Sequence, residues 1–240
     1  MEIIEFGNST IEYEVIKSSR KTIGFEVNPE KGVLIRSPKN LSSHQIKEMV
    51  KKKAGWILEK QEKLNEVKSK PVPKEFMSGE KLPYLGRRYR LKVTTKDIQG
   101  VSLRLYQGKF QIEVSNKITK EDRRELIHQE VINWYKKHAA TKLEERVNKY
   151  KKQVGKEPAK IKIKEQKKRW GSCSSLGNLN FNWKIIMAPM SVVDYIVVHE
   201  LAHLKYPNHS KDFWDLVGTI IPNYKEKQEW LRINGKQLNI

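Results

Sequence analysis

The sequence has very little cysteine: Cys173 is the only one among 240 residues. A single cysteine excludes an intrachain disulfide and any zinc ribbon of several thiolates, so histidines and carboxylates would have to hold a metal ion. Long apolar runs are also missing, because no stretch approaches the roughly 18 residues of a membrane span. Residues 1–6 carry acids where a secretory signal would carry bases. These absences predict a cytoplasmic protein with no membrane segment.

Acidic residues are scarce relative to basic ones. There are 28 Asp and Glu against 48 Lys and Arg, which gives a formal net charge of +20. This charge predicts affinity for anionic partners, but it does not choose among nucleic acids, nucleotides, acidic proteins and acidic membranes. A hydrophobic content of 38%, with six Trp and nine Tyr, still predicts a chain that folds around a core.

The first 118 residues have the pattern of strands joined by turns, with one long helix. Segments rich in β-forming residues occur at residues 11–15, 32–36 and 103–112. Between them, Ser42 and Gln45 form a capping-box pattern, and apolar residues then recur at helical spacing over residues 43–67. We expect residues 1–118 to form a β-rich N-terminal region, whose recognition role the sequence does not reveal.

Helical patterns dominate from residue 119 onwards. A long helix is expected over residues 121–152, a period-two strand at residues 161–164 and a strand-like segment at residues 179–187. Another helical run follows Pro189. The predicted fold class is therefore α+β, with a compact second domain over residues 119–240 in which helices lie over a small sheet.

Three of the six histidines fall within eleven residues, as His199-Glu200-x-x-His203 followed by His209. On a helix, His203 lies about 40° around the axis from His199 and Glu200 lies about 100° around, so all three project from one side. Two imidazoles one helical turn apart can bind a single cation. The motif therefore predicts a metal site.

The helix that carries this motif is apolar on nearly all sides, and a capping box of Ser191 and Asp194 predicts that it begins at about Val192. A helix without a polar face should be buried in the centre of its domain. Two imidazoles and a carboxylate buried there would destabilise the fold unless they were paired or bound a metal ion. Binding of a metal removes that cost.

A tetrahedral catalytic zinc ion takes three protein ligands and leaves one position for water. The third ligand is predicted to be His209, with Asp212 and Asp215 as alternatives. Glu200 is predicted to be the general base, which takes a proton from the attacking water and passes it to the leaving amine. A further donor should stabilise the oxyanion. The candidate donors are Tyr195, Tyr206, Tyr224 and Asn182.

The other histidines and the cysteine have less specific contexts. His44, His128 and His138 lie on expected amphipathic helices and are predicted to be surface or boundary residues. Cys173 is predicted to be a small residue in a tight loop, and the alternative is a thiol near the metal.

Three segments resemble the YgjP-like zinc metallopeptidases, which are relatives of the SprT and WLM-type peptidases. They are residues 168–174 (Lys-Arg-Trp-Gly-Ser-Cys-Ser), residues 177–183 (Gly-Asn-Leu-Asn-Phe-Asn-Trp) and residues 197–214, which contain the His-Glu-x-x-His motif. The chain lacks the cysteines of the zinc ribbon that follows the SprT peptidase domain.

This resemblance implies a zincin-like catalytic domain with a buried His-Glu-x-x-His helix. It implies that His199, His203 and His209 are the zinc ligands and that Glu200 is the catalytic residue. It also implies an edge strand that aligns an extended substrate, and residues 179–186 are the natural candidate for that strand.

The sequence therefore predicts a zinc metallopeptidase, a hydrolase that acts on polypeptides. A second hypothesis keeps the metal but changes the substrate to nucleotides or other phosphoanhydrides, which a basic cleft would gather. A third is a protein associated with nucleic acid, as a protease recruited to DNA would be, because residues 146–170 contain eleven bases and two acids. The candidate contacts are Lys160, Lys162, Lys164, Lys167, Lys168 and Arg169.

Overall fold

The computed structural model describes residues 1–28, 31–67, 69 and 71–240. It has two compact units, Met1–Lys68 and Ser69–Ile240, and each has its own core. Helices and three small mixed sheets alternate along the chain, so the predicted α+β class is confirmed. Across the described ranges, no helix combines the length and the apolar character that crossing a membrane requires.

In the first unit, one helix covers one face of a four-stranded sheet with the strand order β1-β2-β4-β3. The central pair β2 and β4 is parallel, and the outer pairs are antiparallel. The predicted capping box begins the helix, because Ser42 Oγ accepts from Gln45 N at 3.2 Å and Gln45 Oε1 accepts from Ser42 N at 3.0 Å. The elements are β1 (Glu2–Phe6), β2 (Ser9–Ser18), β3 (Gly24–Asn28), β4 (Gly32–Pro38) and α1 (Ser43–Asn65).

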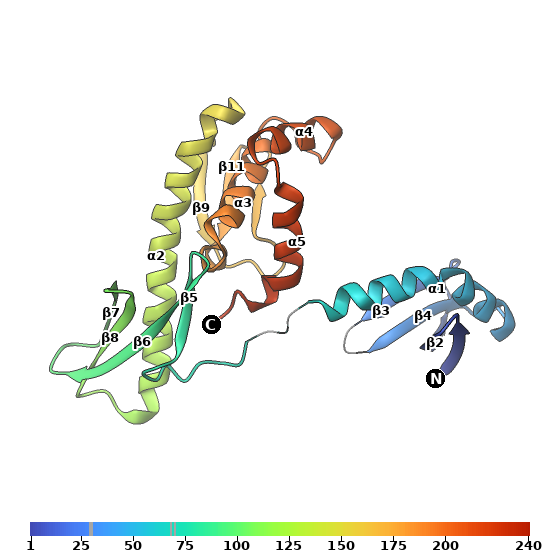
Figure 1. Cartoon of the computed structure of the whole chain (residues 1–240), viewed down its shortest axis with the longest axis horizontal. Helices are drawn as coiled ribbons and strands as arrows, with labels where there is room; N and C mark the ends of the chain where they lie inside the picture. Colours follow the sequence, from blue (N-terminus) through green and yellow to red (C-terminus); the bar gives the residue numbers. More distant parts are fainter. Residues whose placement is uncertain (29–30, 68, 70) are drawn as a thin grey trace. The chain divides into compact units, whose positions relative to one another are not determined.

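The second unit begins with a four-stranded sheet that packs against a 35-residue helix, α2 (Figure 1). The sheet has the order β5-β6-β8-β7, and its buried face meets α2 through aromatic rings. The Phe110 ring lies 4.8 Å from the Trp134 ring in an edge-on contact, a geometry that aromatic pairs favour. The elements are β5 (Lys81–Tyr84), β6 (Arg87–Lys96), β7 (Val101–Tyr106), β8 (Lys109–Ser115) and α2 (Lys120–Val154).

The rest of the second unit surrounds one buried helix, α3. A three-stranded sheet with the order β10-β11-β9 lies on one side of it, and helices α2, α4 and α5 also contact it. The elements are β9 (Lys160–Lys164), β10 (Gly171–Cys173), β11 (Asn178–Asn182), the 3₁₀-helix η1 (Trp183–Met187), α3 (Met190–Ala202), α4 (Lys211–Ile220), α5 (Tyr224–Asn234) and the 3₁₀-helix η2 (Gly235–Gln237).

The compact units divide between Lys68 and Ser69, whereas the sequence predicted a division near residue 118. The physical reason lies in α2, whose N-terminal half covers the β5–β8 sheet while its C-terminal half packs against α3. The two sheets of this unit therefore share one core, and a cut near residue 118 would separate a sheet from the helix that buries it.

The turn between β5 and β6 holds the start of α3. Leu85 N donates to Ile186 O at 2.8 Å, and Gly86 N donates to Met187 O at 3.3 Å. Gly86 has a φ of +80°, and a Cβ atom there would lie 2.8 Å from the Cα of Pro189. Glycine is required at this position by both the backbone conformation and the close approach.

The predicted capping box at the start of α3 is wrong. The helix begins at Met190 after Pro189, and no side chain caps it. Asp194 instead accepts from Arg146 Nε at 2.5 Å, from Arg146 Nη2 at 2.8 Å and from Tyr150 Oη at 3.0 Å. The carboxylate is buried, and a paired guanidinium on α2 stabilises it better than a backbone amide would. This ion pair fastens α3 to α2.

The prediction of an edge strand at residues 179–186 is also wrong. β11 ends at Asn182, lies in the centre of its sheet, and is followed by the 3₁₀-helix η1. Antiparallel β10 and parallel β9 occupy its two edges, so its backbone groups are already paired. β10 and β9 are the edge strands of this sheet.

Replacement of Arg146 by Ala should strongly destabilise the second unit, because Asp194 would be left buried without its cationic partner. Loss of one partner of a buried ion pair typically lowers the free energy of unfolding by about 3 kcal/mol or more. Urea unfolding followed by near-ultraviolet circular dichroism measures the change. Lys142→Ala removes a more exposed partner of Glu145 and should lower it by less than about 1 kcal/mol. Equal effects of the two substitutions would contradict this account.

Candidate metal centre

The first histidine and the glutamate of the motif lie in the last turn of α3, and His203 follows as its C-terminal cap residue. α3 is buried along nearly its whole length, as its apolar composition predicted. His199 and His203 remain half-buried, whereas Glu200 is only 4% exposed. The helix thus brings two imidazoles and a carboxylate to one end of the core.

The ring of His203 is oriented by a backbone carbonyl. Its Nδ1 atom lies 3.1 Å from Tyr206 O, and since a carbonyl only accepts, Nδ1 must carry the proton. Nε2 is then the unprotonated nitrogen, available as a ligand. Such hydrogen bonds to the far nitrogen fix the tautomer of metal-binding histidines.

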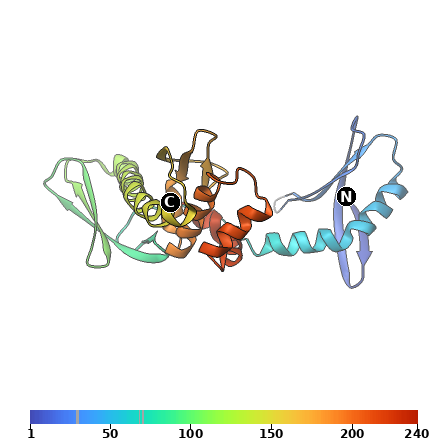
Figure 2. The ribbon, with the colours of Figure 1, turned by 90° about the horizontal axis from the view of Figure 1, so that it is seen from above.

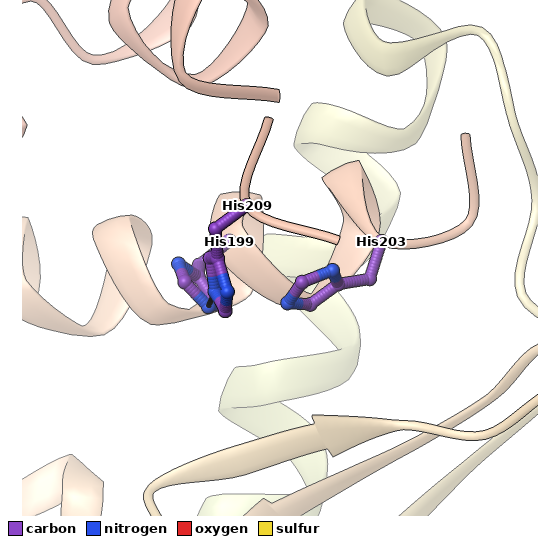
Figure 3. Close-up of side chains that lie close together, drawn as sticks. All are labelled: His199, His203 and His209. Carbon is purple, nitrogen blue, oxygen red and sulfur yellow. Dashed lines mark hydrogen bonds between the residues drawn. The ribbon is translucent and has the colours of Figure 1, made fainter. Parts of the chain in front are cut away.

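His209 reaches the same place from the loop that joins α3 to α4 (Figure 3). Its Nε2 atom lies 3.1 Å from Nε2 of His199. The chain then enters α4 directly, because Ser210 Oγ accepts from Phe213 N at 3.4 Å. The Trp214 ring stacks on the His209 ring at 5.4 Å, so the next turn of the chain supports the exposed histidine.

Each of the three histidines offers one nitrogen, and these nitrogens all lie within 4.8 Å of one another. A tetrahedral zinc ion with Zn–N distances near 2.0–2.1 Å requires ligand nitrogens roughly 3.3 Å apart. The 3.1 Å separation between His199 and His209 is close to that value. The three side chains therefore fit a metal ion, both in donor type and in spacing.

The environment keeps the imidazoles of His199 and His203 neutral, which is the form that binds a metal. Burial, with smaller contributions from His203 and His209, lowers the pKa of His199 to about 3. Burial also lowers the pKa of His203, against a smaller opposite effect of the hydrogen bond to Tyr206. At neutral pH His199 and His203 therefore each have one unprotonated ring nitrogen.

Glu200 is held against a glycine. A Cβ atom on Gly171 would lie 2.6 Å from both Cγ and Oε1 of Glu200, so no other residue fits at position 171 without a shift. Burial raises the pKa of Glu200 to about 8, and the nearby Arg169 partly opposes this effect. A carboxyl group with a pKa near neutrality can both take up and release a proton at physiological pH.

A cavity of about 800 Å³ opens beside these residues. α3 and the loop with His209 form one wall, and β10 with the residues that flank it forms the other. Glu200, all three histidines and Arg169 line it. The three residues of β10 therefore border the same cavity as Glu200 and the histidines.

Most of the alternative ligands and candidate oxyanion donors lie away from the histidine cluster and the cavity. The alternative ligands are not part of the histidine cluster: Asp212 is exposed, and Asp215 accepts from Lys211 at 2.7 Å. Of the four candidate oxyanion donors, only Tyr195 lines the cavity, with its hydroxyl 3.5 Å from His199 Nδ1. Asn182 is committed elsewhere, since its amide group donates to the carbonyls of Gln166 and Arg169.

Cys173 ends β10 and lines the cavity rather than lying in a tight loop. Burial raises the pKa of its thiol, with a contribution from Glu200, so the thiolate is disfavoured. The single histidines are as predicted, because His44 is exposed and His128 and His138 are half-buried on helices.

The lysines of β9 alternate with isoleucines as the sequence predicted. Lys160, Lys162 and Lys164 are exposed, and the two isoleucines between them pack against the core. Lys167, Lys168 and Arg169 follow in the exposed segment before β10. Binding of nucleic acid by these residues stays a prediction.

Two residues contribute to this centre in ways that the sequence did not predict. Gly171 was part of a recognised motif, but only the structure relates it to Glu200. Arg169 was predicted as a contact for nucleic acid, yet it also lines the cavity beside Glu200. Gly171 and Arg169 both lie in the segment 168–174. That segment contains no residues at the spacing of metal ligands, so the sequence did not connect it to the metal site.

A model of the family described as "YgjP-like, metallopeptidase domain" matches residues 21–234. No curated protein matches the sequence. Among solved structures, the metallopeptidase zymogen of Pyrococcus abyssi abylysin is similar with a TM-score of 0.35 and 26% identity, over 39% of this chain and 93% of that one. The zymogen of Methanocaldococcus jannaschii jannalysin has a TM-score of 0.34 and 24% identity, over 39% and 95%.

Replacement of His199 by Ala should weaken zinc binding by at least about 100-fold, because it removes one of three converging ligands. Competition with a chromophoric chelator measures the affinity. Asp212→Ala, which changes an alternative ligand outside the cluster, should bind zinc within a few-fold of the wild type. A larger loss for Asp212→Ala than for His199→Ala would contradict the three-histidine assignment.

The metal-free Glu200→Gln protein should gain stability over the wild type as the pH rises from about 5 to about 8. Burial raises the pKa of Glu200 from 4.5 to about 8, so the stability that this group contributes is complete below pH 4.5 and is lost as the pH rises through 8. The difference in free energy of unfolding should widen by on the order of 3 kcal/mol.

Urea denaturation with chelator present, at several pH values, measures this difference. Glu144→Gln, which changes an exposed glutamate on α2, serves as the control and should show no such widening. A difference for Glu200→Gln that stays constant with pH would mean that the buried carboxyl group is not destabilising when ionised.

Proposed function

The chain belongs to the YgjP-like metallopeptidase family, and from this premise we propose that it is a zinc-dependent peptidase. One observation carries the proposal: three imidazole nitrogens converge within 4.8 Å beside a buried carboxyl group that lines the same cavity. In this proposal His199, His203 and His209 hold the ion, and Glu200 is the catalytic residue.

A bound zinc ion would polarise the scissile carbonyl and make a water molecule acidic at neutral pH. Glu200 takes the proton from the attacking water and delivers it to the leaving amine. A nearby dication favours the ionised form of a carboxyl group, which prepares Glu200 to act first as a base. Gly171 keeps the carboxyl group in place, because any side chain at that position would displace it.

An extended polypeptide fits the cavity wall as an added strand. β10 is an edge strand that pairs with β11, and its three residues line the cavity. Backbone hydrogen bonds to such an edge align a substrate without regard to most of its side chains. Arg169 on the cavity wall favours acidic substrates.

Hydrolysis of a phosphoanhydride at the same centre is the competing function. Arg169 on the cavity wall supports it, since a guanidinium group binds phosphate oxygens well. The peptide substrate is favoured because the edge strand β10 offers backbone donors and acceptors in a row, which suit a polypeptide rather than a nucleotide.

Glu200→Gln should keep zinc and lose hydrolysis of unfolded casein by at least about 100-fold, the usual contribution of a general base. Chelator should abolish the wild-type activity, and added zinc should restore it. Glu144→Gln should retain full activity. Parallel incubation with nucleoside triphosphates distinguishes the competing function: phosphate release that chelator stops, without cleavage of casein, would overturn the peptidase proposal.

A further inference from the structure

The sheet β5-β6-β8-β7 has a strongly cationic outer face. Its four strands contain eight lysines and arginines and one acid, Glu113. α2 covers the inner face, as the views in Figures 1 and 2 both show, and the alternating burial of the strands leaves the other face in solvent. The outward cations are Lys81, Arg88, Arg90, Lys92, Lys96, Arg104 and Lys109, and all seven are exposed.

The strand register arranges these side chains in rows. Lys81, Arg90 and Lys109 are direct neighbours across three strands, and Tyr106 completes the row on β7. Neighbouring strands lie about 4.8 Å apart, and residues on the same face of a strand lie about 6.6 Å apart. The cations therefore form a grid that spans the sheet.

Most of this charge is not neutralised within the protein. Lys96 pairs with Glu113 at 2.5 Å, and Arg104 donates to Gln111 at 3.1 Å. Among the described residues, the other five outward cations have no ion pair within 4.0 Å. Like charges this close destabilise one another, so an anionic ligand would relieve the repulsion.

An exposed aromatic ring accompanies the grid. Tyr106 is 52% exposed, and the Arg104 guanidinium carbon lies 5.4 Å from the centre of its ring. Cationic grooves that track phosphates, combined with aromatic rings and arginines on which bases stack, are how proteins bind single-stranded nucleic acid. No other side chain on this face is both large and apolar, so insertion into a lipid surface is disfavoured.

We propose that the outer face of the β5-β6-β8-β7 sheet binds single-stranded nucleic acid, through its cationic grid and the ring of Tyr106. This surface differs from the row of lysines on β9, which has no exposed aromatic residue beside it. The inference goes beyond the proposed peptidase activity and does not depend on it.

Fluorescence anisotropy with the full-length protein and a labelled single-stranded DNA of roughly 20 nucleotides tests the proposal. Arg90→Gln/Lys92→Gln/Lys109→Gln should weaken binding by about tenfold or more at about 0.1 M salt. It should also reduce the slope of log affinity against log salt by about 2, because three phosphate contacts are lost. Lys160→Gln/Lys162→Gln/Lys164→Gln is the matched control, since it removes the same charge from β9, and it should bind within about twofold of the wild type.

Tyr106→Ala tests base stacking separately from charge, because it removes the aromatic ring and leaves every cation in place. It should weaken binding to the single strand by about tenfold while leaving binding to a duplex of the same length within about twofold. Both sheet variants should keep the wild-type circular dichroism spectrum and the wild-type rate of casein cleavage. Equal losses for the two triple variants, tighter binding of the wild type to duplex or to acidic phospholipid vesicles, or no binding at about 0.1 M salt would each overturn the proposal.

Discussion

Burial of polar groups at the end of α3 is the constraint around which the second unit is built. An apolar helix in the centre of a core ends in two imidazoles and a carboxyl group, and burial there lowers the pKa of His199 and raises that of Glu200. Each neighbouring element compensates for part of that burial. The carbonyl of Tyr206 fixes one ring, His209 completes the cluster, and Gly171 leaves room for the carboxyl group.

The same helix is held in place by contacts far along the chain. The ion pair between Arg146 and Asp194 fastens it to α2, and the turn at Gly86 closes on Pro189 just before it begins. Neither contact involves the histidine cluster, yet both hold α3, the helix at whose end the cluster lies. The geometry of the cavity thus depends on residues from three separate parts of the sequence.

The positive charge of the chain has no single function in this structure. Arg146 is half-buried in an ion pair, Arg169 lies on the cavity wall, and the lysines of β9 form the exposed face of that strand. Seven further exposed cations lie on the outer face of the β5–β8 sheet, which precedes the basic stretch at residues 146–170 in the sequence. A charge run along the chain and a charge patch on a surface are different things, because only strand pairing brings the patch together.

The sequence predicted what is local. The His-Glu-x-x-His spacing, the capping box at Ser42 and the alternation on β9 each depend on a few neighbouring residues, and the structure has all three. The sequence-based prediction was wrong where a residue distant in the chain determines the local structure. Asp194 has the spacing of a helix cap but pairs with a guanidinium 48 residues away, and residues 179–182 became a central strand because β9 and β10 flank them. Likewise, the contact of Gly171 with Glu200 has no local signature.

The length of α2 sets the distance between two surfaces of the second unit. Its 35 residues extend for about 52 Å, and one half supports the cationic sheet while the other half supports α3. α2 contains no Pro or Gly, the residues at which helices kink sharply, so the two surfaces keep a nearly constant separation. A single ligand bound to both the cationic sheet and the histidine cluster would have to span this separation. The distance between its two bound segments, rather than its sequence, would then determine which of its bonds lies beside the histidines.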